Sequence, residues 1–138
     1  MDLANEFHRL VGAAQDAWLM SRGDFRTLEP RLLDLLQFVV SHPDGRPQFV
    51  ALFAELVSQI GFSRSNGVVR VATQAVEFCM RELQWPEIRF ALEERRQAEK
   101  DPSVKNRLLV GVLNAYDADW HNARLYAYYA RGRSPTKN

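Results

Sequence analysis

The tightest group of side chains that could bind a metal ion is Asp117-Ala-Asp119-Trp-His121, near the C-terminus. Carboxylates and imidazoles are zinc ligands, but three ligands so close together need a fourth from elsewhere in the chain. Both aspartates also have local uses, because Asp119 can cap the helix expected after it and Asp117 can close the turn before it. The sequence therefore predicts no metal site, and an enzyme built on these three residues is only the third hypothesis.

The other residues that could do chemistry also give no clear sign of an active site. The sequence contains no P-loop, no GxSxG, no HExxH and no CxxC motif. Cys79, the only cysteine, lies on the apolar stripe of an expected helix, where a cysteine is typically a small buried hydrophobe. The segment GFSRSNG (residues 61–67) could present amides and Arg64 to an anion at a helix N-terminus, or it is an ordinary capped loop. We expect no catalytic residue and no cofactor.

Aromatic residues concentrate near the C-terminus, where all four tyrosines fall between residues 116 and 129. On a continuous helix, residues 126, 128 and 129 point in directions roughly 60–160° apart, so one face cannot bury all three rings. Tyrosine, tryptophan and arginine dominate the hot spots of protein interfaces. The alternative is a terminal helix packed by amphipathic tyrosines whose hydroxyls reach water. The predicted protein-binding residues are Trp120, Arg124, Tyr126, Tyr128 and Tyr129.

The elements that must position these residues are expected to be helices, because apolar residues recur with a period near 3.6 and no sustained period of 2 is found. The second expected helix is apolar over more than half of its circumference and should be central. The pattern predicts an all-α domain over residues 1–131, followed by a flexible basic tail over residues 132–138. The seven expected helices cover about residues 2–22, 27–41, 47–60, 67–83, 86–100, 102–116 and 118–130.

Two stretches, PEIRFAL (residues 86–92) and DPSVKNRLL (residues 101–109), open successive helices in the same way: a proline, then a β-branched residue, then a basic residue. Helix starts recur in pairs roughly 35–38 residues apart, a period typical of stacked α-hairpins. The residues Asp101-Pro102 and Val104-Lys105 resemble the start of the second helix in HEAT and armadillo repeats, and the resemblance covers about residues 48–116. It implies a right-handed superhelix used as a binding surface. The alternative is an irregular helical bundle.

Composition excludes few partners. The net charge of +1 provides no overall field to attract nucleic acid or an anionic membrane. The N-terminal stretch MDLANEFHRL lacks the features of a secretory signal, and no apolar run approaches the ~18 residues that a membrane helix needs. We therefore expect a cytoplasmic protein without a membrane partner.

The sequence favours a non-enzymatic protein-binding module, such as a small bacterial adaptor or a toxin-neutralising immunity protein. Its partner would be another protein, bound by a helical surface that includes the aromatic C-terminal helix. The alternative is a nucleic-acid-binding protein that uses the basic, tyrosine-rich C-terminal segment, because aromatic rings and arginines suit single strands.

Overall fold

The computed structural model describes residues 2–61 and 69–130, and all regular structure in these two ranges is helical. The predicted all-α class is confirmed. The expected tail at 132–138 and the loop residues 62–67 lie outside the described residues. The α-helices are α1 (Leu3–Met20), α2 (Phe25–Val40), α3 (Arg46–Gln59), α4 (Ala72–Leu83), α5 (Pro86–Ala98), α6 (Leu109–Leu113) and α7 (Ala127–Ala130).

Local capping by an aspartate explains the starts of α1 and α2. The carboxylate of Asp2 accepts a hydrogen bond from the amide of Asn5 at the start of α1 (3.1 Å). Asp24 does the same for the amide of Arg26 (2.9 Å), and α2 therefore begins two residues before the predicted start at residue 27. A π-helical turn, η2 (Val104–Leu108), precedes α6, and a 3-10 turn, η3 (Asn114–Tyr116), follows it. Together they complete the helical stretch predicted at 102–116.

Helix α4, rather than α2, is the most enclosed element. Residues 75–81 of α4 are all buried, which means that α4 is covered on every side for about two turns. By contrast, α2 keeps a solvent-facing side at Arg31 and Asp34. The prediction that the second helix is central is therefore wrong. It rested on the apolar share of the helix circumference, and that share does not show that α4 also buries the polar residues Glu77 and Arg81.

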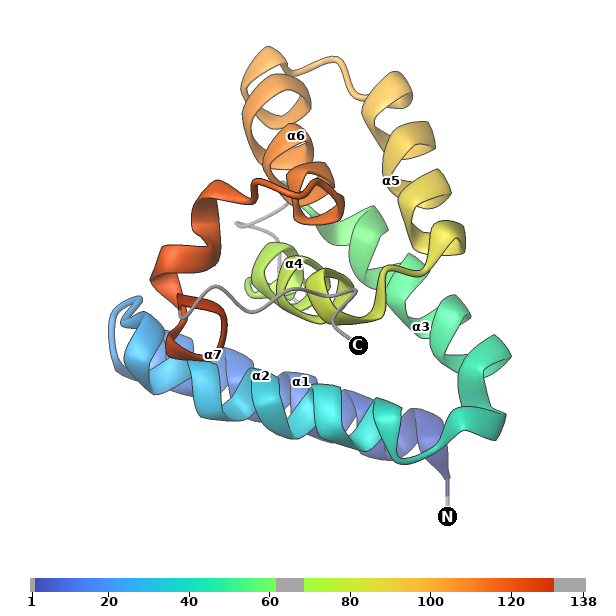
Figure 1. The fold of residues 1–138 in the computed structure, drawn as a ribbon, viewed down its shortest axis with the longest axis vertical. Helices are drawn as coiled ribbons and strands as arrows, with labels where there is room; N and C mark the ends of the chain where they lie inside the picture. Colours follow the sequence, from blue (N-terminus) through green and yellow to red (C-terminus); the bar gives the residue numbers. More distant parts are fainter. Residues whose placement is uncertain (1, 62–68, 131–138) are drawn as a thin grey trace.

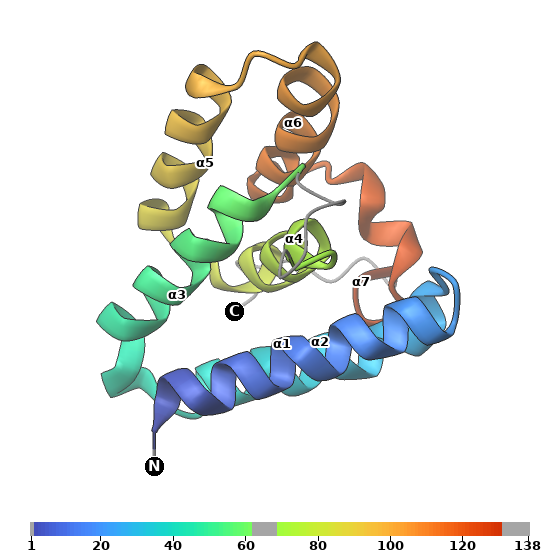
Figure 2. The ribbon, with the colours of Figure 1, turned by 180° about the vertical axis from the view of Figure 1, so that it is seen from behind.

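The arrangement of the helices is clear from two sides. In Figure 1, α1 and α2 form an antiparallel pair low in the molecule, α4 is seen nearly end-on at the centre, and α3, α5 and α6 lie above and to the right. From behind, α1 lies in front of α2 and runs crosswise to α3 (Figure 2).

Helix α1 contacts α3, which contacts α5; α2 contacts α4, which contacts α6. Consecutive α-hairpins would have this order of neighbours. The resemblance to HEAT and armadillo repeats stays a prediction.

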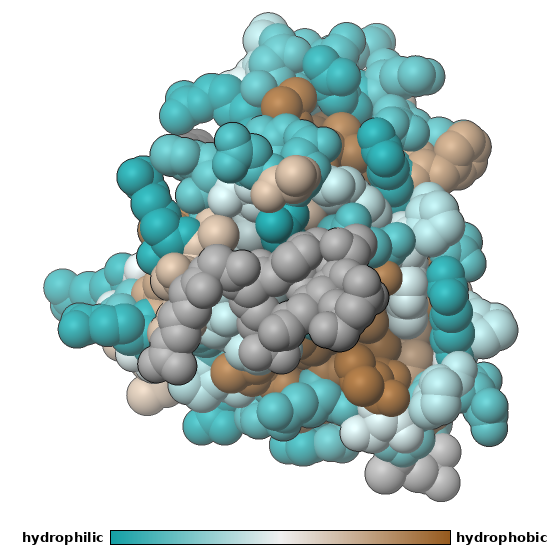
Figure 3. Space-filling view, viewed as in Figure 1, coloured by the Kyte–Doolittle hydropathy of each residue, from teal (hydrophilic) through white to brown (hydrophobic). Residues whose placement is uncertain are grey.

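Within residues 2–61 and 69–130, no helix combines the length and the apolar character needed to cross a membrane. On the face shown in Figure 3, hydrophilic residues predominate, and the main hydrophobic area lies low on this face, in the region of α2.

Candidate protein-interaction surface

The last predicted helix is not continuous. Residues His121–Leu125 form a 3-10 helix (η4), Tyr126 is extended with φ −123° and ψ 126°, and α7 then begins at Ala127. The buried carboxylate of Glu29 on α2 stabilises this new start, because it accepts hydrogen bonds from the amides of Ala127 (3.0 Å) and Tyr128 (2.7 Å). The prediction of one helix over 118–130 is therefore wrong.

The break at Tyr126 allows most of the aromatic rings to turn inward. The ring of Tyr126 is 0% exposed and contacts Phe25 and Phe78 with centroid distances of 5.4 and 5.0 Å. The hydroxyl of Tyr129 donates a hydrogen bond to the carbonyl oxygen of Phe78 (2.7 Å). Trp120 stacks on Tyr126 and is also buried. The argument that one face cannot bury these rings assumed a continuous helix, which this segment does not form.

Only part of the predicted site reaches the surface. Arg124 is exposed and Tyr128 is half-buried, whereas Trp120, Tyr126 and Tyr129 belong to the hydrophobic core. Burial raises the pKa of the hydroxyls of Tyr126 and Tyr129 far above the ordinary tyrosine value. The Tyr126 hydroxyl has no hydrogen-bond partner in the part of the chain that the structure describes.

A buried carboxylate on α4 holds the start of the C-terminal segment. Glu77 accepts hydrogen bonds from the indole Nε1 of Trp120 (3.0 Å) and the side-chain amide of Asn122 (2.7 Å). Desolvation raises the pKa of Glu77, and the two hydrogen bonds offset only part of that increase. The sequence gives no sign of this role, because Glu77 and Trp120 are 43 residues apart. The sequence pattern also does not show that α4 is buried on all sides.

One turn later on α4, Arg81 binds backbone carbonyl groups of the same segment. Its guanidinium donates to the carbonyl oxygens of Ala115 (3.0 Å), Asp117 and Ala118 (3.3 Å). It also lies 5.6 Å from the ring centroid of Trp120. These hydrogen bonds offset the cost of burying the guanidinium of Arg81. They also give hydrogen-bond partners to carbonyl groups of the C-terminal segment. The C-terminal aromatic cluster is held as part of the fold.

The residues considered for chemistry do not assemble into a site. Asp117, Asp119 and His121 are all exposed, and no group of three His, Cys, Asp or Glu side chains within residues 2–61 and 69–130 could hold a metal ion. Cys79 is completely buried, as its helical position predicts, and burial raises the pKa of its thiol well above the ordinary value.

Three of the six large apolar side chains that are exposed among the described residues lie at one end of the molecule. Leu19 and Met20 end α1, and Met20 is 86% exposed. Leu125, also exposed, ends η4, which lies beside the turn between α1 and α2 in both views (Figures 1 and 2). Arg22 and Arg124 are exposed at the same end and form no ion pair with any described residue. We call these five residues the α1-end patch.

A pocket of about 180 Å³ lies between α1 and α3. Its floor is apolar and its rim is polar, with Gly12 forming part of the wall. We call it the α1–α3 pocket. Its lining consists of Phe7, His8, Val11, Gly12, Gln15, Leu52, Glu55, Leu56, Gln59 and Val69. The sequence does not single out any of these residues, because they alternate between the apolar stripe and the polar sides of two ordinary helices.

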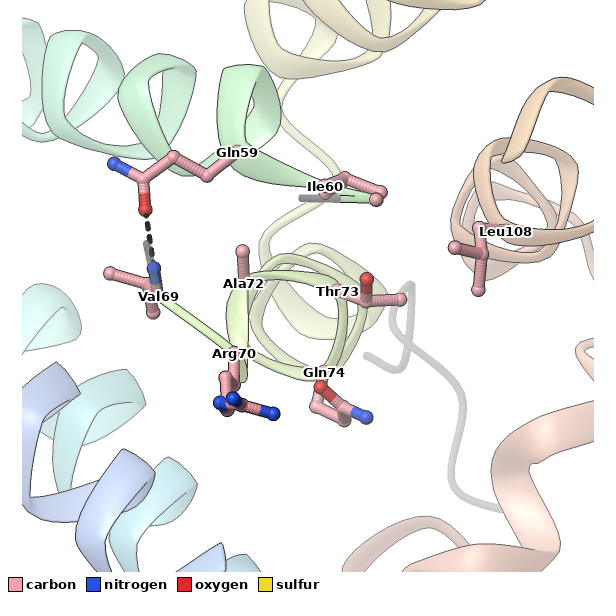
Figure 4. Close-up of a pocket in the computed structure, with 9 residues that line it drawn as sticks. Gln59, Ile60, Val69, Arg70, Ala72, Thr73, Gln74 and Leu108 are labelled. Atoms are coloured by element: carbon pink, nitrogen blue, oxygen red, sulfur yellow. Dashed lines mark hydrogen bonds between the residues drawn. The ribbon is translucent and has the colours of Figure 1, made fainter. Parts of the chain in front are cut away.

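A second pocket, of about 200 Å³, lies where α3 ends and α4 begins (Figure 4). The side-chain oxygen of Gln59 accepts a hydrogen bond from the amide of Val69 at its edge (3.1 Å). Of the segment predicted as an anion site or capped loop, only Gly61 is described, with φ +93°. Residues 62–67 lie outside the described residues, so the anion site stays a prediction.

The chain matches no model of a known protein family, and neither a curated protein nor a solved structure matches it. A proposal about its function rests on the geometry alone.

Proposed function

We propose that this chain is a non-enzymatic protein-binding module, of the kind found in small bacterial adaptors or toxin-neutralising immunity proteins. The α1-end patch carries the proposal. Leu19 and Met20 at the end of α1 and Leu125 at the end of η4 are exposed, and these two helix ends lie near each other (Figure 1). A folded protein gains stability by burying such groups, and apolar surface that stays exposed and is rimmed by polar residues is typical of interaction sites.

The charges at the edge of the patch favour a particular partner. Arg22 and Arg124 have no ion-pair partner among the described residues, and arginine is enriched in protein interfaces. Arg22 also takes a left-handed conformation (φ 57°) in the turn that follows α1. A complementary surface would therefore have an apolar centre and carboxylates at its edge.

The predicted aromatic residues contribute to this proposal in two ways. Arg124 belongs to the patch, and the half-buried Tyr128 lies four residues further along the chain. Trp120, Tyr126 and Tyr129 would act indirectly, because their burial fixes the position of Leu125 and Arg124.

The test compares charge substitutions at matched exposed positions. Met20→Glu and Leu125→Glu should each weaken the complex with the natural partner by about tenfold or more, because a buried interface residue is replaced by a charge. Val40→Glu is the control, since Val40 is 56% exposed and lies at the other end of α2. The partner is first captured from the native host with the wild-type chain, and its affinity for each variant is then measured by calorimetry. Equal affinities for all three variants would place the interface elsewhere.

Nucleic-acid binding has less support, because it requires rings that bases can stack on and three of the five predicted residues are buried. Binding of a single-stranded oligonucleotide that weakens steeply with salt and is lost in Arg22→Glu and Arg124→Glu would favour it over protein binding.

A further inference from the structure

The α1–α3 pocket has an apolar floor that no described residue fills. Phe7 and Val11 of α1 face Leu52 and Leu56 of α3, and all four side chains are buried. The volume of about 180 Å³ is similar to that of cavities that hold a benzene-sized molecule. It is smaller than the ~300–1,000 Å³ of typical cofactor or drug sites. One leucine, methionine or phenylalanine side chain is therefore the size of group that fits.

Gly12 leaves one side of this pocket open. A Cβ atom added at Gly12 would meet no neighbouring atom within 4 Å. Glycine in the middle of a helix is less stable than alanine, and no contact inside the described chain requires it here. A large side chain at residue 12 would instead occupy the space next to the floor.

Polar groups surround the mouth of the pocket. The Nε2 atom of His8 lies 3.7 Å from a carboxylate oxygen of Glu55, so the two helices approach each other there. Glu55 is mostly exposed, and it is the only acidic residue in the lining. The side-chain oxygens of Gln15 and Gln59 accept hydrogen bonds from the amides of Arg70 and Val69, and their NH₂ groups donate to no residue that the structure describes.

Part of the pocket lining lies on the same side of α1 as Leu19 of the α1-end patch. His8, Gly12, Gln15 and Leu19 follow one another at intervals of three or four residues, and they therefore lie along one side of α1. A polypeptide that covers Leu19 can therefore extend along this side of α1 toward the lining residues His8, Gly12 and Gln15.

We propose that the α1–α3 pocket is an anchor site for one large apolar side chain of a protein partner, and that Glu55 selects a lysine or arginine next to that side chain. The pocket supplies apolar burial, the two glutamines supply donors for a backbone carbonyl group, and the carboxylate supplies the charge that complements a basic residue. The inference rests on the proposed function only in that the natural ligand is a protein.

The experiment uses the full chain and terminally blocked pentapeptides of sequence Gly-X-Z-Gly-Gly, where X is lysine or glutamate and Z is leucine, phenylalanine or alanine. Binding is measured from NMR shifts of the Gly12 amide and of the methyl groups of Val11, Leu52 and Leu56. Replacing leucine by alanine at Z should weaken binding about tenfold to a hundredfold, because the apolar burial is lost. The lysine peptide should bind more tightly than the glutamate peptide, and Glu55→Lys should reverse that preference.

Gly12→Leu should abolish peptide binding by filling the pocket. The matched control is Gly111→Leu, because Gly111 is also a helical glycine with no atom within 4 Å of an added Cβ, and it does not line this pocket. Unchanged binding in Gly12→Leu, equal loss in both variants, or equal shifts with the leucine and alanine peptides would each overturn the proposal. Binding of toluene without binding of any peptide would overturn it as well, since the pocket would then be a small-molecule cavity.

The same variants separate this inference from the proposed function. If Met20→Glu loses the captured host partner while Gly12→Leu keeps it, the chain is a binding module and the pocket is not its anchor site. If the peptides bind as described but neither variant affects a host partner, the proposed α1-end interface is wrong and the pocket remains a peptide site.

Discussion

The C-terminal aromatic segment and the outer face of α1 have opposite combinations of residue type and exposure. The segment contains the residue types that dominate interfaces, yet Trp120, Tyr126 and Tyr129 are buried. The face of α1 has ordinary residues such as Gln15 and Gly12, yet it leaves a pocket open and Met20 almost fully exposed.

The difference lies in which polar groups have partners within the chain. At the C-terminus, Glu29, Glu77 and Arg81 supply partners for backbone and side-chain groups, and burying the rings therefore leaves few polar groups unsatisfied. Between α1 and α3, His8 and Glu55 pair with each other but both stay mostly exposed, and Arg22 after α1 has no ion-pair partner among the described residues. Aromatic content thus suggests where a site could be, but the hydrogen bonds made inside the chain determine whether it is available.

The largest expected effect comes from removing a buried ring. Tyr129→Ala should reduce the free energy of unfolding by about 3–5 kcal/mol, because a large core side chain leaves a cavity. Tyr128→Ala should cost about 1 kcal/mol or less, since Tyr128 is only half-buried. Urea unfolding of the two variants measures the comparison directly. Equal losses would mean that both tyrosines contribute to the core in the same way.

Much of the fold could be predicted from local signals. The apolar period, the cap at Asp101 and the prolines at residues 47 and 86 define helix starts with little reference to the rest of the chain. Asp101, for example, accepts a hydrogen bond from the amide of Ser103 (2.9 Å). Such contacts join residues two or three apart, so the sequence pattern contains the necessary information.

The position of the aromatic rings could not be predicted in this way. The break at Tyr126 depends on Glu29, almost a hundred residues earlier, and the position of Trp120 depends on Glu77. The α1–α3 pocket likewise forms only when two helices that are each unremarkable in sequence come together. Both features arise from long-range contacts, which no periodicity encodes.

The next largest effect should come from Arg81. Arg81→Met should reduce the free energy of unfolding by about 3 kcal/mol, because the carbonyl groups that Arg81 binds would lose their partner. Arg31→Met is the control, since Arg31 is exposed and its pair with Asp34 is worth about 1 kcal/mol or less. Chemical denaturation of both variants tests this. A loss no greater than that of the control would mean that water replaces Arg81 in binding the segment.

Glu77 should make the free energy of unfolding depend on pH. Because its pKa is raised in the folded chain, the folded state binds the proton more tightly than the unfolded state. The free energy of unfolding should therefore fall as the pH rises above the ordinary glutamate value of 4.5 and level off above the folded pKa. Glu77→Gln cannot ionise and should lack this contribution. The measurement is the free energy of unfolding of both proteins at several pH values across that range. The same pH dependence in both would mean that a group other than Glu77 is responsible.

The smallest expected effect concerns the other region and has the opposite sign. Gly12→Ala should increase the free energy of unfolding by about 0.5–1 kcal/mol, because alanine restricts the unfolded chain and favours the helix. Gly111→Ala should give a similar gain, since an added Cβ meets no atom within 4 Å at either position. Thermal and urea unfolding of the two variants provide the measurement. A loss of stability in Gly12→Ala alone would mean that the α1–α3 pocket is already filled by the chain itself. In that case the contrast between a closed aromatic segment and an open α1 face would not hold.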